Sequence, residues 1–206
     1  MTQRPWPCWS LLRARKKTIA ARRARAVVAY DGTNYSGFQR QANAPSVQAA
    51  LEEAIREVTG EKAGVIGAGR TDAGVHGTGQ VIAFDTAWIE DEAPPETDRE
   101  QRCAGDLQRA LNAVLPADIA VRELRLAAPD FHPRYDAVSR QYRYTVYNAP
   151  VRSPLARWHS LHVMGALDVN AMQEAAALLV GEHDFAAFGR PPTGDSTVRR
   201  VLTAEW

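Results

Sequence analysis

The alternation of apolar and polar positions predicts ordered structure from Ala26 onward. Residues 26–30 form a short apolar, partly β-branched run that is typical of a strand, and residues 31–34 supply turn-forming side chains after it. A helix is predicted next, with Ser46 as its N-cap and Gly60 as its C-cap. Its apolar positions follow helical spacing: Val47, Ala50, Leu51, Ala54, Ile55 and Val58.

Four more elements complete this first region. Strands are predicted near 63–67 and 79–86, followed by a helix over 102–114 that Pro116 ends and a strand at 119–127. The resulting order is β-α-β-β-α-β. It predicts an α+β fold of the ferredoxin-like type, in which an antiparallel sheet carries both helices on one face.

A second, shorter unit is predicted in the last third of the chain. Residues 137–148 alternate like a strand, and a helix follows at about 169–180, between Asp168 as N-cap and Gly181 as C-cap. A strand over 198–206 ends the sequence. One face of the first of these strands carries Arg140, Tyr142, Tyr144 and Val146.

The second unit has only β-α-β where the first has six elements, so we interpret it as an incomplete ferredoxin-like unit. Such a unit leaves a sheet edge and a core face uncovered, and another subunit covers them unless the chain is a fragment. We therefore predict three regions: a basic, disordered extension over 1–25, a first domain over 26–128 and a partial second domain over 129–206.

The composition is that of an ordinary globular protein. Of the 206 residues, 45% are hydrophobic and 24% are charged, which excludes a wholly disordered chain, a collagen and a coiled coil. No apolar stretch approaches the roughly 18 residues that a membrane-spanning helix needs. Cys8 and Cys103 lie far apart without Cys-x-x-Cys spacing, so neither a disulfide framework nor a thiolate zinc site is supported.

The net charge of +1 conceals an uneven distribution. The first 25 residues carry eight basic side chains and no acidic one, whereas the rest of the chain carries 17 basic and 24 acidic side chains. A basic extension on a mildly acidic body suggests a polyanionic partner. A solvated extension without a partner, or an organelle transit peptide, would give the same pattern.

The segment with the most chemical content is glycine-rich and covers residues 67–77. It is not a dinucleotide-binding loop, because the third glycine of that motif would fall on Asp72, whose carboxylate would repel a pyrophosphate. Arg70 can stay close to Asp72, keep the carboxylate ionised and orient it. An ionised, oriented aspartate suits nucleophilic attack, although an Asx turn in an ordinary hairpin loop would use the same residue types.

The sequence Gly-Arg-Thr-Asp-Ala-Gly-Val-His at residues 69–76 resembles the signature of the TruA family of tRNA pseudouridine synthases. Further segments resemble family motifs and occur in the family's order: 29–39, 131–135, 139–144, 181–185 and 198–201. The resemblance covers about residues 26–206 and implies the pseudouridine synthase fold, with two ferredoxin-like units around a largely antiparallel sheet. It also implies the reaction, which is the isomerisation of uridine to pseudouridine.

The resemblance assigns a role to each candidate site residue. Asp72 takes the position of the nucleophile, which would attack the uracil ring or the ribose anomeric carbon before the base turns and bonds through C5. Tyr142 would stack on the flipped target base, and Arg70 would hold Asp72 or a phosphate. His76 would support the loop at the substrate rather than act in catalysis. The candidate RNA contacts are Gln39, Arg140 and Arg143.

Family members act on the anticodon stem-loop of tRNA, at positions 38, 39 and 40, as cytoplasmic homodimers. The resemblance therefore implies a tRNA partner and a second copy of the chain, with no membrane and no small-molecule cofactor. Neither a metal nor a redox cofactor is expected, because the isomerisation involves no net oxidation. His159 and His162 lie three residues apart, but no third metal ligand accompanies them.

The resemblance also has a limit. Family members have a further C-terminal segment with an arginine that faces the nucleophile, and this sequence stops at Trp206, before that segment. We therefore expect weak or absent activity and poor solubility unless Arg70 takes the place of that arginine. Two other functions stay open: a non-catalytic RNA-binding remnant or RNA chaperone of the same fold, and a metal-dependent nuclease that uses Asp72 and His76.

Overall fold

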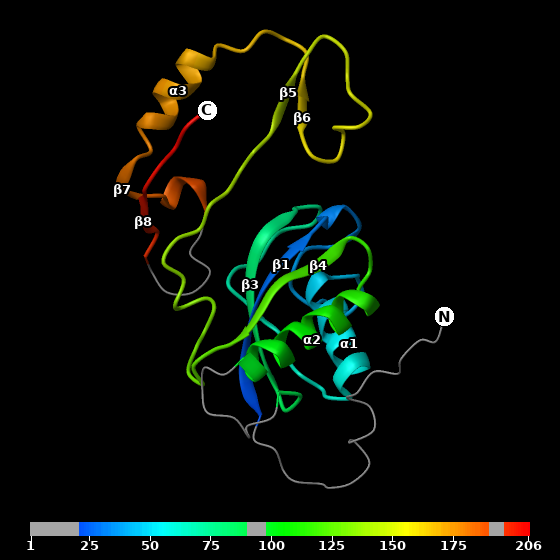
Figure 1. The fold of residues 1–206 in the computed structure, drawn as a ribbon. Coiled ribbons are helices and arrows are strands. Elements are labelled where there is room, and N and C mark those ends of the chain that lie inside the picture. Colours follow the sequence, from blue (N-terminus) through cyan, green and yellow to red (C-terminus); the bar gives the residue numbers. More distant parts are fainter. Residues whose placement is uncertain (1–20, 90–97, 190–195) are drawn as a thin grey trace, which may run out of the picture. The chain divides into compact units, whose positions relative to one another are not determined.

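The computed structural model describes residues 21–89, 98–189 and 196–206, which form two compact units (Figure 1). The first unit ends at Gln141 and the second begins at Tyr142. This division falls later in the chain than the domain boundary predicted after residue 128. No helix among the described residues is long and apolar enough to cross a lipid bilayer.

The first unit is a four-stranded antiparallel sheet with two helices on one face (Figure 1). Its helices are α1 (Val47–Thr59) and α2 (Asp98–Val114). The spatial order of the strands is β2 (Ile66–Gly67), β3 (Gly77–Thr86), β1 (Arg22–Tyr30) and β4 (Ile119–Leu126). This is the strand order of the ferredoxin-like fold, so the α+β fold class predicted from the sequence is confirmed.

Alternation along β1 places every second side chain of the strand in the core. These side chains are at most 5% exposed: Ala24, Ala26, Val28 and Tyr30. The two helices contribute their apolar faces to the same core through Leu51, Ile55, Leu107 and Leu111. The periodicity that predicted these elements therefore also identified which of their faces is buried. Burial of this apolar surface holds the helices on the sheet.

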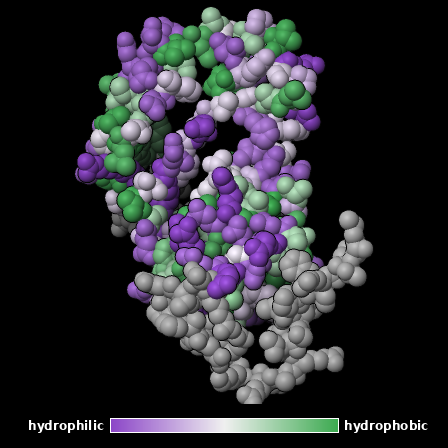
Figure 2. Space-filling view, viewed as in Figure 1, coloured by the Kyte–Doolittle hydropathy of each residue, from purple (hydrophilic) through white to green (hydrophobic). Residues whose placement is uncertain are grey.

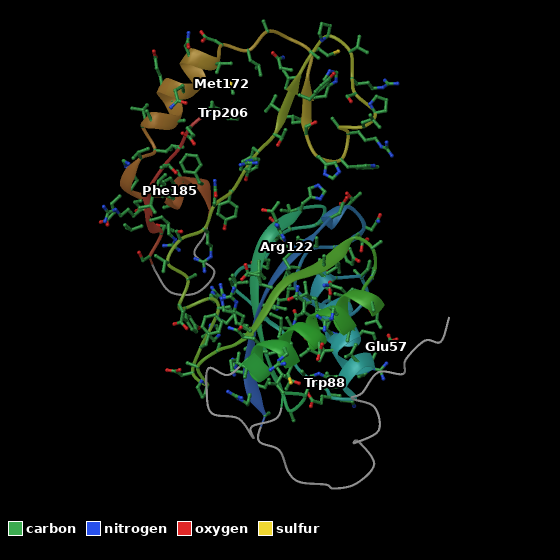
Figure 3. The ribbon with its side chains drawn as sticks, in the orientation of Figure 1. Glu57, Trp88, Arg122, Met172, Phe185 and Trp206 are labelled. Carbon is green, nitrogen blue, oxygen red and sulfur yellow. The ribbon has the colours of Figure 1, made fainter. Side chains whose placement is uncertain are left out.

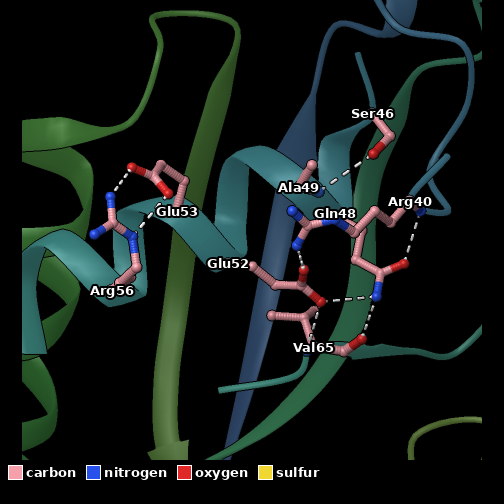
Figure 4. Close-up of polar contacts among 8 residues, drawn as sticks. All are labelled: Arg40, Ser46, Gln48, Ala49, Glu52, Glu53, Arg56 and Val65. Atoms are coloured by element: carbon pink, nitrogen blue, oxygen red, sulfur yellow. Dashed lines mark hydrogen bonds and ion pairs between the residues drawn. The ribbon is translucent and has the colours of Figure 1, made fainter. Parts of the chain in front are cut away.

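Both predicted ends of α1 are confirmed. The Ser46 hydroxyl accepts a hydrogen bond from the Ala49 amide at 3.3 Å, which satisfies one of the amides that the helix itself leaves unpaired (Figure 4). At the other end Gly60 has a φ of 76°, the left-handed conformation that commonly ends a helix.

β1 begins at Arg22, four residues before the predicted start, so residues 22–25 do not belong to a disordered extension. Ala24 is completely buried, and Arg23 donates two hydrogen bonds to Asp85 of β3, at 2.7 and 3.2 Å. The arginines gave this stretch the composition of a solvated tail, but in a strand Arg23 and Arg25 point away from the core while Ala24, between them, points into it. Residues 1–20 of the predicted extension lie outside the described residues.

Three other boundaries in this unit differ by a few residues from the prediction. β2 is limited to Ile66–Gly67, because only these two residues pair with β3. β3 begins at Gly77 and α2 at Asp98, in both cases earlier than the periodicity of their apolar residues indicated. The ends of a helix or strand are set by backbone hydrogen bonds and not by buried side chains. A hydrophobic pattern therefore does not locate these ends.

The second unit contains two small sheets and one helix. β5 (Val146–Asn148) runs parallel to β6 (Leu161–Val163), and β7 (Gly181–Asp184) runs antiparallel to β8 (Val198–Val201). The helix, α3, covers Val169–Ala177. The predicted N-cap of this helix is confirmed, because the Asp168 carboxylate accepts a hydrogen bond from the Ala171 amide at 3.0 Å.

The predicted strand over 137–148 is wrong for most of its length, since only Val146–Asn148 pair, as β5. The Thr145 carbonyl oxygen accepts a hydrogen bond from the Leu161 amide of β6 at 2.8 Å, but no strand of the described residues pairs with 137–144, and Tyr142 and Tyr144 are 72% and 84% exposed. Alternating side chains are a property of any extended backbone. A strand also needs a partner for its amide and carbonyl groups, and the local pattern does not report whether one is present.

The predicted ends of the last helix and the last strand are also wrong. α3 stops at Ala177, and Gly181 begins β7 with a φ of 117° instead of capping the helix. β8 stops at Val201, because Val201 pairs with Gly181, the first residue of β7, and no described residue of β7 pairs with the positions that follow. The Trp206 amide instead donates a hydrogen bond to the Gln173 side chain at 2.8 Å.

Hydrophobic side chains of the second unit lie largely at its surface, where Figure 2 shows them as green patches. Ala176 is the one hydrophobic residue of this unit that is buried among the described residues. Met172 and Trp206, labelled in Figure 3, both line a cavity of about 340 Å³ within the unit. The second unit therefore buries little apolar surface of its own.

Candidate active site

Asp72 lies in the loop between β2 and β3, residues 68–76, which we call the Asp72 loop. A turn follows at once, because the Val75 amide donates a hydrogen bond to the Asp72 carbonyl oxygen at 3.2 Å. The Asp72 side chain is exposed, and no hydrogen bond to its carboxylate is formed within the described residues. The carboxylate therefore does not close an Asx turn, which was the structural alternative for this residue.

A second loop, residues 31–45, holds the backbone just before Asp72. The Phe38 amide donates a hydrogen bond to the Thr71 carbonyl oxygen at 3.0 Å. The Thr71 hydroxyl lies 2.9 Å from the hydroxyl of Tyr30, the last residue of β1. Thr71 is thus anchored through both its backbone and its side chain, and Asp72 follows directly from this anchored residue.

The backbone beyond the carboxylate is held by the same second loop. The Gly74 amide donates to the Tyr35 carbonyl oxygen at 3.1 Å. The Gly32 amide donates to His76 Nδ1 at 3.1 Å, and the same nitrogen lies 3.0 Å from Asp31 Oδ1. An Nδ1 that accepts an amide proton carries none itself, so a neutral His76 bonds to Gly32, and its contact with Asp31 becomes an ion pair only on protonation.

Two glycines allow the loops to approach each other so closely. A Cβ on Gly37, whose φ is +101°, would lie 2.5 Å from the Thr71 carbonyl oxygen. A Cβ on Gly32 would lie 2.0 Å from the Val75 carbonyl oxygen. Both obstructing atoms belong to the backbone and cannot rotate away, so the contact between the loops requires glycine at these positions.

A polar network fixes the second loop to α1 (Figure 4). The Gln48 side chain accepts a hydrogen bond from the Arg40 amide at 2.9 Å and donates to Glu52 Oε1 at 2.9 Å and to the Val65 carbonyl oxygen at 3.0 Å. Glu52 is 13% exposed and forms an ion pair of 2.5 Å with Arg40. The network connects the second loop, α1 and Val65, the residue before β2. It therefore restrains the second loop, which in turn holds the Asp72 loop.

Arg70, the predicted partner of Asp72, is exposed and forms no ion pair with it among the residues that the structure describes. A different predicted residue reaches the Asp72 loop. Arg140 Nη2 donates to the Ala68 carbonyl oxygen at 3.0 Å and to the Arg134 carbonyl oxygen at 3.2 Å. The structure thus brings the Arg140 guanidinium to this loop, and the roles of Arg70 and Arg140 stay predictions.

The other candidates for substrate contact all lie at the surface. Gln39 is exposed in the second loop, next to the polar network around Gln48. Tyr142 and Arg143 belong to the second unit, where Tyr142 is 72% exposed. An exposed ring is available for stacking on a base, as the role predicted for Tyr142 requires. The structure does not bring these two residues and Asp72 together within one unit, so their roles stay predictions.

Three arginines lie on the sheet face opposite the helices: Arg122 and Arg125, which the sequence patterns did not single out, and Arg25, which was counted with the basic extension. Arg25 of β1 and Arg125 of β4 are register partners, so like charges stand opposite each other, which is unfavourable in a sheet. Arg122, at an irregularity in β4, donates a hydrogen bond to the Thr78 carbonyl oxygen at 3.2 Å (Figure 3). We call Arg25, Arg122 and Arg125 the basic face.

The basic face could have been found in the sequence. Arg122 and Arg125 occupy polar positions of a strand whose apolar positions were used to identify the core. The Arg125 side chain is 71% exposed and forms a long ion pair of 3.8 Å with Glu123. The sequence pattern does not report that β1 pairs with β4. This pairing brings Arg25 opposite Arg125, although the two residues are 100 positions apart.

The ferredoxin-like sheet and the aspartate on a firmly held β2–β3 loop define an α+β protein of the pseudouridine synthase fold. The family model described as tRNA pseudouridine synthase matches residues 26–136. The chain belongs to this family, as its resemblance to the TruA motifs implied.

Individual relatives agree with the family model. The chain is 45% identical over 183 residues to "tRNA pseudouridine synthase A" of Geotalea uraniireducens and 46% identical over 182 residues to the protein of that name from Syntrophotalea carbinolica. The alignments cover 88% of this chain in both cases, and 70% and 68% of the two relatives. The protein of that name from Neisseria meningitidis is 44% identical over 172 residues, which are 83% of this chain and 60% of the relative.

Proposed function

We propose that this chain is an isomerase that converts uridine to pseudouridine in tRNA, with Asp72 as its nucleophile. The observation that carries the proposal is an exposed carboxylate that takes no part in the hydrogen bonds of the described residues, on a loop whose backbone is anchored before and after it. A side chain that the fold does not use and that the backbone holds in place is suited to attack a substrate. The names of the relatives support tRNA as the substrate.

The proposed reaction balances without any added reagent. Asp72 attacks the uracil ring or the ribose anomeric carbon, and the glycosidic bond between N1 and that carbon breaks. The base turns, and C5 forms the new bond to the anomeric carbon. C5 then loses its proton, N1 gains one, and the aspartate is released. Substrate and product are isomers, so no step needs an oxidant, a reductant or a redox cofactor.

We further propose that the anticodon stem-loop binds over the basic face, with positions 38, 39 and 40 as targets. Arginines on an open sheet face suit contacts with RNA phosphates, which position an RNA without reading its sequence. Tyr142 would stack on the everted base, and Gln39, Arg140 and Arg143 would add contacts. The finer features of the family, a homodimer that works in the cytoplasm, belong to the same proposal.

The test of the proposed function uses two tRNA transcripts that carry tritium at C5 of uridine. One has uridine at positions 38, 39 and 40, and in the other these positions are cytidine. We expect tritium release from the first transcript above the protein-free control, and none from the second. Equal release from both transcripts would contradict the assignment of the target positions.

Replacing Arg125 with alanine tests the basic face. We expect weaker tRNA binding and a slope of log Kd against log salt concentration that is smaller by about one, because one phosphate contact is lost. The matched control is Arg109→Ala, since Arg109 is also 71% exposed and also lies beside a carboxylate, that of Asp106 on α2. If both variants change the slope equally, the effect reflects net charge and not this face.

The alternative function is that of an RNA-binding remnant or RNA chaperone without catalysis. The basic face would serve that function equally well. The two functions differ at Asp72, which matters only to the enzyme, and tRNA binding without tritium release by the unchanged chain would favour the remnant. A metal-dependent nuclease has less support, because no group of three possible metal ligands within the described residues includes Asp72.

A further inference from the structure

Tyr30 combines a buried ring with a polar contact to the Asp72 loop. Only 5% of this residue is exposed, and its ring packs against that of Phe38, with centroids 6.1 Å apart. A Cβ on Gly77 would lie 2.5 Å from the Tyr30 ring, so the start of β3 is shaped to the ring. The hydroxyl at the end of this ring lies 2.9 Å from the Thr71 hydroxyl.

We propose that Tyr30 is a positioning residue for Asp72. Its hydroxyl fixes the side chain of Thr71, and the Phe38 amide fixes the carbonyl oxygen of the same residue. Two anchors on one residue restrict the rotation of its backbone, and the next peptide unit leads directly to Asp72. The inference rests on the proposed function, because it treats the direction of the Asp72 carboxylate as what the reaction requires.

The hydroxyl, and not only the ring, is needed for this role. Phenylalanine would fill the same apolar space against Phe38 and Gly77, so packing alone does not account for a tyrosine. Burying a hydroxyl is unfavourable unless it forms a hydrogen bond, and the bond formed here is directed at Thr71. Burial also raises the pKa of Tyr30, partly offset by the bond to Thr71, so the hydroxyl keeps its proton at neutral pH.

The test compares Tyr30→Phe, Thr71→Val and the double variant. We expect each single variant to release tritium from C5-labelled tRNA about tenfold more slowly in single turnover, with unchanged Kd for tRNA, because the carboxylate is misdirected rather than lost. The double variant should be no slower than either single one, since both remove the same bond. Thr71→Ser, which keeps the hydroxyl, should restore most of the rate.

A second readout does not depend on activity. Hydrogen exchange at the amides of Gly74 and Val75, which are bonded within and across the loops, should become faster in Tyr30→Phe. The matched control is Thr86→Val, which removes a buried hydroxyl bonded to Glu61 at 2.7 Å at the other end of β3. It should lower the melting temperature without changing the rate or exchange in the Asp72 loop.

The outcomes separate this inference from the proposed function. Slower tritium release and faster exchange in Tyr30→Phe together support the positioning role. A rate or an exchange profile equal to that of the unchanged chain overturns it, even where Asp72→Asn is inactive. If the unchanged chain releases no tritium, the proposed function fails, and exchange at Gly74 and Val75 then decides alone whether Tyr30 anchors the loop.

Discussion

Replacing Asp72 with asparagine is expected to abolish pseudouridine formation while sparing tRNA binding. Asparagine has the same shape, so the backbone hydrogen bonds of Thr71, Gly74 and Val75 persist, but its amide is not a nucleophile. We expect single-turnover release of tritium from C5-labelled tRNA to fall roughly a thousandfold or more, with Kd for tRNA within about twofold of the unchanged chain. Filter binding on the same transcript measures the second quantity.

The control for this variant is Asp106→Asn on α2. Asp106 is an exposed aspartate that is paired with Arg109, and its change removes the same charge from the helix side of the sheet. We expect Asp106→Asn to release tritium at the same rate as the unchanged chain. Tritium release retained by Asp72→Asn would show that the nucleophile is another residue. Loss of binding together with release would show that the substitution disturbs the RNA site rather than the chemistry.

Replacing Gly37 with alanine is expected to have the second largest effect, because the new methyl group would meet backbone and not side chain. The added Cβ would lie 2.5 Å from the Thr71 carbonyl oxygen, in a residue whose φ of +101° already disfavours any side chain. The two loops must separate to relieve the contact. We expect a loss of about 3 kcal/mol in the free energy of unfolding, the upper end for overpacking, and a rate reduced about a hundredfold.

The matched control is Gly60→Ala. Gly60 also has a positive φ, of +76°, but no atom lies within 4 Å of a Cβ placed there. The control therefore carries backbone strain of roughly 1–2 kcal/mol without any contact to the Asp72 loop. Thermal unfolding should show both variants destabilised, and tritium release should show only Gly37→Ala slowed. Slower tritium release by Gly60→Ala would mean that protein stability, and not the geometry of the Asp72 loop, limits the rate of release.

The elements that local patterns describe well were predictable. α1 begins and ends where Ser46 and Gly60 indicated, because caps and helical periodicity involve residues only a few positions apart. The antiparallel sheet with its two helices followed from the order of elements, since few arrangements bury the apolar faces of six elements in this order. The family motif likewise placed Asp72 on the loop between two strands.

The second unit shows where such patterns are insufficient. Residues 137–144 alternate like a strand, yet no described strand pairs with them and Tyr142 and Tyr144 are exposed. At the other end of the chain, the arginines of residues 22–25 suggested a solvated tail, although Ala24 is in the core. In both segments the missing information was the neighbour, because a strand is defined by the hydrogen bonds it shares with another segment.

The amino-acid sequence was sufficient for the helices, the apolar faces of the strands, the fold class and the family with its aspartate motif. The fold was needed for the hydroxyl of Tyr30 on Thr71, the backbone of Gly37 against the same residue, and Arg25 opposite Arg125. Each of these contacts joins residues more than 30 positions apart. Helical and strand periods act over a few residues, whereas contacts at such separations depend on strand order and register, which form only when the whole sheet assembles.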